Sequence, residues 1–127
     1  MNQSEANHIQ VNVETRYIEE QSQPNKNYFV FAYTVTIQNT GHQTAQLLTR
    51  HWIITDSNQK VQEVKGDGVI GEQPTLKPGE RFVYTSGTML ETSVGTMKGS
   101  YQMIADDGTR FDASIAEFVL SPPRVLH

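Results

Sequence analysis

The sequence predicts an all-β protein, an immunoglobulin-like or fibronectin-type-III-like antiparallel sandwich of seven to nine strands. Three observations predict this fold. Apolar residues recur at every second position, turn residues separate these segments at short intervals, and the single tryptophan, Trp52, lies in mid-strand as a core tryptophan would. A small barrel is the alternative. The 127 residues suit one domain, with a core at about 9–122 and loose ends at 1–8 and 123–127.

The first half of the chain contains two long alternating segments. Residues 9–17 alternate apolar and polar side chains, and residues 28–37 place a row of aromatic and β-branched side chains on one face. The polar segment 19–27 between them (EEQSQPNKN) is a loop. Two hairpins then follow, with turns at 39–41 and 57–58 and strands at 45–56 and 61–64.

Glycine and proline interrupt the middle of the chain. Residues 66–79 (GDGVIGEQPTLKPG) hold four Gly and two Pro, so we expect no regular element to run through this loop. A strand resumes at 81–86, and residues 87–95 form a second irregular crossing.

The last part of the chain predicts a hairpin and a bulge. Strands at 97–105 and 111–115 are joined by an Asp-Asp-Gly turn at 106–108. The apolar residues then change from odd to even positions at 118, which predicts one extra residue near Ala116. Two prolines at 122–123 end the sheet, because they lack the amide donors that a ladder needs.

Composition excludes several classes of function. The formal charge of −4 and the absence of a basic block argue against nucleic-acid binding, and the absence of cysteine excludes disulfides, zinc-thiolate sites and thiol catalysis. The sequence has neither a leader-like N-terminus nor an apolar run long enough to span a membrane, so we expect a cytoplasmic protein without membrane insertion.

Gly66, Gly68 and Gly71 match the spacing G-x-G-x-x-G, which raises the question of a phosphate-binding loop. In a dinucleotide-binding fold this loop opens a helix, but Pro74 and Pro78 prevent a continuous helix here, and the lysine of a Walker A loop is missing. We therefore interpret the glycines mainly as turn residues. The alternative is an anion nest of their amides, with Lys65 or Arg50 supplying positive charge.

Arg50, His51 and Trp52 place a cation, an imidazole and an aromatic ring on one strand. Alternation puts Arg50 and Trp52 on one face and His51 on the other, so the three cannot form one site. If Trp52 is in the core, Arg50 needs a carboxylate or carbonyl partner, and we predict a structural ion pair. His51 is then a packed or surface imidazole.

We predict no metal site, no cofactor and no enzymatic activity. The four histidines lie on separate elements, and no G-x-S-x-G motif is present. Three aspartates around the last hairpin could hold a divalent cation weakly, but this turn requires the same residues. The histidines are His8, His42, His51 and His127, and the aspartates are Asp106, Asp107 and Asp112.

From residue 9 to about 122 the sequence resembles the ApaG family. The resemblance rests on six blocks: IQN at 37–39, LLTRHWII at 47–54, GDGVIGEQPTLKPG at 66–79, YTSG at 84–87, GTMKGSY at 95–101, and the phenylalanines 111 and 118. It implies a small bacterial protein with a fibronectin-type-III-like sandwich, linked to cobalt resistance and magnesium efflux. Similar domains in eukaryotic F-box proteins and a polymerase-delta-interacting protein imply contact with other proteins.

These observations leave three hypotheses for the function. The preferred one is a non-enzymatic domain that presents sheet edges and the 66–79 loop to an unknown protein partner or to a second copy of itself in a homodimer. The second is a phosphate, pyrophosphate or nucleotide binder that uses the amides of the three glycines. The third is a divalent-metal sensor or chaperone that uses the aspartates of the last hairpin or a histidine pair.

Overall fold

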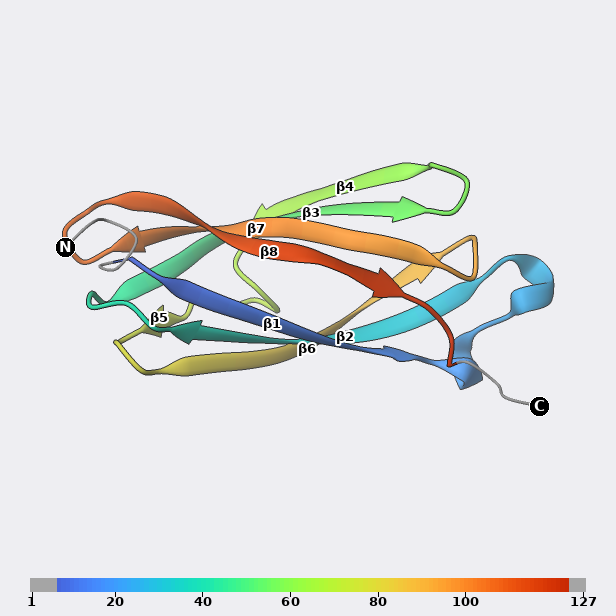
Figure 1. Ribbon diagram of the computed structural model, residues 1–127, viewed down its shortest axis with the longest axis horizontal. Helices are drawn as coiled ribbons and strands as arrows, with labels where there is room; N and C mark the ends of the chain where they lie inside the picture. The colour runs from blue at the N-terminus through green and yellow to red at the C-terminus, as the bar shows by residue number, and fades with distance from the viewer. Residues whose placement is uncertain (1–6, 124–127) are drawn as a thin grey trace.

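The computed structural model describes residues 7–123, which form two antiparallel sheets packed face to face (Figure 1). One sheet has the strand order β1-β2-β6, and the other has the order β4-β3-β7-β8 with the short β5 paired to β3. The predicted sandwich is confirmed, and the small barrel is wrong because the strands belong to two separate sheets. The strands are β1 Ile9–Tyr17, β2 Phe29–Asn39, β3 Ala45–Asp56, β4 Val61–Asp67, β5 Thr75–Leu76, β6 Arg81–Leu90, β7 Gly95–Ala105 and β8 Arg110–Leu120.

Helical structure within residues 7–123 is limited to two short 3₁₀ turns. These are η1 Glu19–Gln21 and η2 Pro24–Lys26, and both lie inside the segment that the sequence predicts to be a loop. None of the helices in the described part of the chain is long and apolar enough to cross a membrane. The predicted loose ends at 1–8 and 123–127 fall mostly outside the described residues.

Trp52 lies at the centre of the core, as its position in the sequence predicts. Its side chain is 2% exposed. Its ring makes edge contacts with Tyr33, Phe118 and Tyr101 at centroid distances of 5.4, 5.9 and 6.3 Å. Edge-to-face contacts of this kind stabilise a core beyond the area that they bury. Because Tyr33 belongs to one sheet and Trp52 to the other, this aromatic cluster joins the two layers.

The bulge predicted near Ala116 is present in β8. Gly99 pairs with Ile115 and Met97 pairs with Phe118, so two steps along β7 match three steps along β8. The extra residue restores the inward direction of the side chains after Ile115.

A second bulge, in β3, is not visible in the sequence. Leu47 and Thr49 pair with adjacent residues of β7, which leaves Leu48 as the extra residue. Leu47 is fully buried and Leu48 is half-buried, so Leu47 and not Leu48 accompanies Trp52 in the core. Two consecutive leucines hide the change of parity, and this is why the hydrophobic pattern did not reveal it.

Two predicted strand ends are wrong because regular pairing continues through a glycine, and one predicted loop contains a short strand. β6 does not end at residue 86 but extends to Leu90, and Gly87 pairs with Ala32 within the ladder. β4 reaches Asp67, so Gly66 lies inside a strand. The short β5 interrupts the 66–79 loop, through which we expected no regular element.

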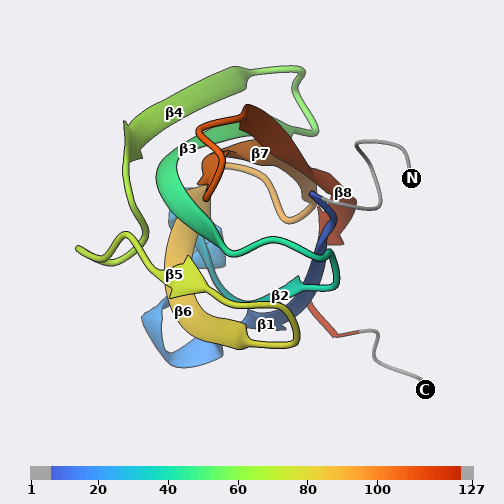
Figure 2. The same ribbon diagram turned by 90° about the vertical axis from the view of Figure 1, so that its left-hand side faces the viewer.

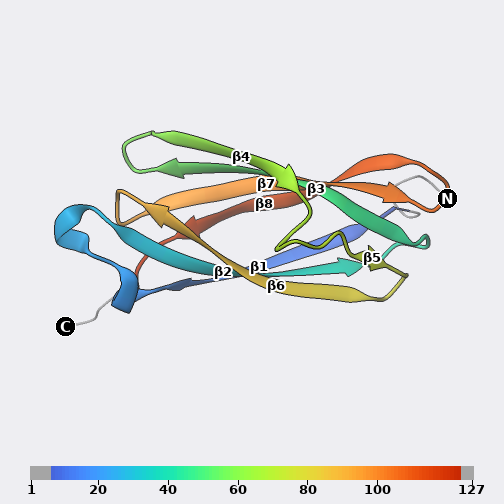
Figure 3. The same cartoon turned by 180° about the vertical axis from the view of Figure 1, so that it is seen from behind.

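The two sides of the sandwich differ, and we call the side that β4 and β6 border the open side (Figure 2). β1 lies against β8 on the opposite side, while β4 and β6 are the edge strands of the open side. Seen from behind, β4 and β6 border this open side and the 66–79 loop runs between them (Figure 3). The candidate sites below all lie near these two strands.

Candidate functional site

The first part of the 66–79 loop is a tight, ordered turn. Val69 and Glu72 exchange backbone hydrogen bonds of 2.8 and 2.9 Å, and the two residues between them, Ile70 and Gly71, have φ angles of +43° and +79°. Two consecutive positive φ angles are the signature of the turn type found in two-residue hairpins. Val69 is fully buried, which fastens the turn to the core. No helix begins at Gly71, although a dinucleotide-binding loop would open one there.

The three glycines of the G-x-G-x-x-G match occupy different structural positions. Gly66 is in β4, Gly68 follows the strand, and Gly71 lies in the turn. The N–H of Gly68 donates to the carbonyl of Leu48 at 2.8 Å, so this amide is already used. A Cβ on Gly68 would lie 2.3 Å from the carbonyl oxygen of Glu72, and its φ of +61° disfavours other residues as well. The requirement for glycine at 68 is therefore structural.

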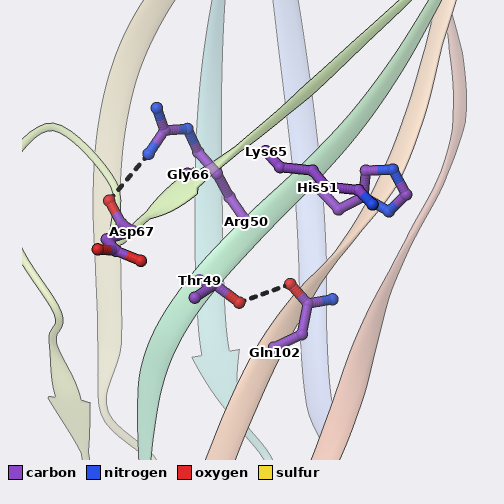
Figure 4. Close-up of a pocket in the computed structure, with 7 residues that line it drawn as sticks. All are labelled: Thr49, Arg50, His51, Lys65, Gly66, Asp67 and Gln102. Atoms are coloured by element: carbon purple, nitrogen blue, oxygen red, sulfur yellow. Dashed lines mark hydrogen bonds between the residues drawn. The ribbon is translucent and has the colours of Figure 1, made fainter.

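Arg50 fastens the end of β4 to β3. Its Nη1 donates to the carbonyl oxygen of Asp67 at 2.9 Å (Figure 4) and to that of Gly68 at 2.9 Å. The guanidinium lies so close to Gly66 that a Cβ there would be 2.7 Å from Nη2. These two carbonyls are the polar partners that the sequence predicts Arg50 to need. The predicted ion pair is wrong, because no ion pair within residues 7–123 includes Arg50.

His51 points to the other side of β3 from Arg50, as alternation predicts (Figure 4). Its Nε2 lies 2.8 Å from Oε1 of Glu63, and the Nζ of Lys65 lies 3.4 Å from the same oxygen. The hydrogen bond from His51, followed by the contact with Lys65, holds the pKa of Glu63 below its usual value. The imidazole of His51 and the ammonium group of Lys65 therefore already face a carboxylate.

A shallow depression of ≈ 460 Å³ brings several predicted residues together. Arg50, His51, Lys65 and Gly66 line it, whereas Trp52, Gly68 and Gly71 do not. Sequence reasoning missed its other lining residues, because the pairing of β3 with β4 and β7 places them there and no motif marks them. These are Thr49, Asp67 and Gln102, with the Thr49 hydroxyl donating to Oε1 of Gln102 at 2.8 Å.

A longer groove runs along the open side, between β4 and β6, and we call it the β4–β6 groove. It consists of two adjoining cavities of ≈ 400 and ≈ 390 Å³ that share Ile54, Gln62 and Met89. The first cavity includes Arg50. The second extends to Lys60 and Glu91, which form an exposed ion pair at 3.0 Å. Apolar side chains of both sheets line the groove: Tyr33, Trp52, Ile54, Val61, Val64, Met89, Leu90 and Met97.

Two buried tyrosine hydroxyls near the groove were also missed by the sequence analysis. Tyr84 of β6 and Tyr101 of β7 share a hydrogen bond of 2.5 Å between their hydroxyl oxygens, which links the two sheets. Burial raises the pKa of Tyr84 to about 12 and raises that of Tyr101 further. Both hydroxyls are therefore protonated at neutral pH, and they serve the fold.

The candidate metal ligands do not come together. Within residues 7–123 there is no group of three His, Asp or Glu side chains placed to hold an ion. Asp107 accepts from the N–H of Thr109 at 2.9 Å, and its pKa is lowered chiefly by hydrogen bonding to Thr109. Gly108 has a φ of +85° and donates to Ala105, so these residues form the predicted hairpin turn. His127 lies outside the described residues.

Known proteins resemble this chain over nearly its whole length. Proteins called Protein ApaG from Thiobacillus denitrificans and Azoarcus sp. are 60% and 58% identical to it, over 94% and 100% of both chains. A crystal structure of an ApaA protein from Bordetella pertussis superposes with a TM-score of 0.93 at 51% identity, covering 95% of this chain and 98% of that one.

The ApaG domain profile matches residues 19–105, a span that includes β2 to β7 and therefore the 66–79 loop and the β4–β6 groove. This match and the near-full-length identities establish that the chain belongs to the ApaG family.

Proposed function

We propose that this chain is a non-enzymatic domain that binds a protein partner through its exposed sheet edge and the neighbouring 66–79 loop. The observation that carries the proposal is the composition of β6. Residues 82–90 (FVYTSGTML) contain no charged side chain, and no described strand pairs with their outer edge. Folded proteins normally protect such edges with charge, proline or a covering segment, because an open edge is a template for pairing.

The other edge strands differ from β6 in this respect. β4 carries Glu63, Lys65 and Asp67, and β8 carries charged residues and lies against β1. The exposed apolar side chains Val83 and Met89 lie on β6 itself, with 52% and 40% of their surface accessible. The edge that lacks protection therefore also presents apolar surface, which favours a protein contact.

Binding to a partner is also compatible with the link to metal efflux that the resemblance implies. Within the described residues no three His, Asp or Glu side chains are grouped so that they could hold an ion. Under the proposal, any influence on cobalt resistance or magnesium efflux passes through the bound protein.

The test is to identify a partner and then to rebuild the pair from purified components. The tagged chain is used for affinity purification with mass spectrometry, and each candidate is expressed alone and titrated against the chain by calorimetry. We expect at least one direct complex with one-to-one stoichiometry. If no purified candidate binds directly, the proposal is contradicted.

A second candidate function is the binding of phosphate at the depression beside Gly66. It is favoured by the gathering of Arg50, His51 and Lys65 around that depression, and opposed by Glu63, which already faces two of them. A titration with pyrophosphate, followed by NMR of backbone amides, should shift the signals of Lys65 and Gly66 if phosphate binds there. Unchanged signals at millimolar pyrophosphate would exclude it.

A further inference from the structure

We infer that the partner contributes an extended, acidic peptide segment that pairs with the outer edge of β6 and fills the β4–β6 groove. This inference rests on the proposed function and names the partner's chemistry. Three observations support it: the unpaired backbone groups of β6, the shape of the groove, and Arg50, which is the cation lining the groove that has no ion pair among the described residues.

The direction of the backbone groups in β6 follows from its pairing with β2. The N–H of Asn39 donates to the carbonyl of Glu80 at 2.9 Å, directly before β6 begins. Residues of an antiparallel strand alternate between facing the partner strand and facing away from it, and the register from Phe29 to Gln38 is unbroken. The odd residues of β6 therefore present their N–H and C=O groups to the open edge: Arg81, Val83, Thr85, Gly87 and Met89.

The fold leaves room for one more strand at this edge. The sheet β1-β2-β6 ends at β6, and no described strand pairs with its outer edge. The β4–β6 groove occupies that side of the molecule and follows β6 from Ser86 to Glu91. An extended chain advances about 3.4 Å per residue, so a segment of about six residues spans this part of the strand.

Gly87 makes the middle of the edge accessible to another backbone. It is exposed and pairs with Ala32. A glycine within a strand often marks a close approach of a second backbone. Its φ is not positive and a Cβ would meet its nearest neighbour at an ordinary 3.5 Å, so the turn geometry of the fold does not require glycine here.

Arg50 determines the charge of the segment that fits. It is half-buried and lines the first cavity of the groove, and its two bonds to carbonyls both use Nη1. No carboxylate within residues 7–123 forms an ion pair with it. A partly buried guanidinium bonds strongly to a carboxylate. The apolar lining selects alternating apolar side chains, and Arg50 selects an Asp or Glu among them.

The test uses a displayed library of random peptides of about nine residues, selected on the wild-type chain. We expect enrichment of sequences that alternate apolar and polar residues and carry Asp or Glu. A synthetic copy of an enriched peptide is then titrated by fluorescence polarisation. Gly87→Pro removes a free-edge N–H and Gly87→Lys places a charge on the edge, and each should weaken binding about tenfold.

The charge is tested with a matched pair of variants. Arg50→Gln should weaken the peptide about tenfold, and Arg50→Lys should weaken it less. Lys65→Gln removes one positive charge outside the groove and should change binding less than about twofold. Thermal unfolding of each variant confirms that the domain is folded at the temperature of the titration.

Three results would overturn the inference: no enrichment of such peptides, wild-type affinity in both Gly87 variants, or an affinity that does not change in the Arg50 variants. The proposed function is judged separately. A purified protein partner that binds Gly87→Lys as well as wild type would leave the proposed function standing and refute the β6 edge as its site.

Discussion

A hydrogen bond between two tyrosine hydroxyl groups helps to join the two sheets of this domain. Many antibody domains hold their sheets together with a disulfide, but this chain has no cysteine. The Tyr84–Tyr101 hydrogen bond joins β6 to β7, one strand from each sheet, in a region where both side chains are buried. A buried hydroxyl that loses its partner is costly, so each tyrosine depends on the other.

The losses of stability from removing these two hydroxyls should therefore not add. Tyr101→Phe leaves the Tyr84 hydroxyl without this partner, and we expect it to lower the free energy of unfolding by about 1–2 kcal/mol. Tyr84→Phe should act similarly. The double variant should lose less than the sum of the two single losses, as measured by urea denaturation. Strictly additive losses would show that the contact does not couple the sheets.

The same pair predicts a loss of stability in alkaline solution. The pKa of Tyr84 rises from 10.0 in the unfolded reference to about 12 in the folded domain, because burial disfavours the phenolate. A group whose pKa is raised by folding stabilises the fold below its unfolded pKa and loses that effect as the pH rises through the folded value. The free energy of unfolding should therefore fall between about pH 10 and 12, and more steeply than in the double phenylalanine variant.

At the scale of elements, the end of β4 depends on backbone geometry more than on side chains. Gly68 and Gly71 both have positive φ angles, but only Gly68 has a neighbour that a side chain would strike. Arg50 donates hydrogen bonds to the backbone carbonyls of Asp67 and Gly68. The loop is therefore ordered by a few specific contacts, in spite of its glycine and proline content.

These two glycines predict different costs for the same substitution. Gly71→Ala meets open space and should cost about 1 kcal/mol from its left-handed backbone alone. Gly68→Ala adds a clash with the carbonyl of Glu72 and should cost on the order of 3 kcal/mol. Chemical denaturation of the two variants measures the difference. Equal costs would mean that the turn shifts freely to accommodate a side chain at 68.

The sequence predicts the strands well where apolar and polar residues alternate, but it does not predict which strands pair. The predicted hairpin with its turn at 39–41 is wrong, because β2 and β3 belong to different sheets. Alternation locates the long strands, and the change of parity at Phe118 locates the bulge near Ala116. Two adjacent leucines conceal the bulge at Leu48, and Gly87 suggests a break that the ladder with β2 does not make. Composition cannot tell a glycine that pairs within a strand from one that turns the chain.

The candidate site was harder to predict than the strands, because register brings its residues together across the sheets. Alternation correctly directs Arg50 and His51 to opposite sides of β3, although both line the depression beside Gly66, and burial of Arg50 requires a polar partner. The identity of that partner depends on how β4 ends beside β3, which no local pattern encodes. The β4–β6 groove likewise arises where residues of five strands, β2, β3, β4, β6 and β7, come together across the two sheets.

The whole molecule has two unlike sides. β1 and β8 lie together on one side, and on the other β4 and β6 border a groove with Arg50 among its lining residues. β4 carries charged side chains at 63, 65 and 67, while β6 is uncharged from 82 to 90. This asymmetry gives the domain one surface suited to strand pairing, and the account of its function depends on that surface.

Hydrogen exchange of the β6 amides, measured by NMR with and without the selected peptide, tests this account most directly. In the free domain the amides of Val83, Thr85, Gly87 and Met89 should exchange quickly, while those of Tyr84 and Thr88, which face β2, should exchange slowly. In the complex the first four should become protected. Fast exchange of those four amides in a saturated complex would contradict the account.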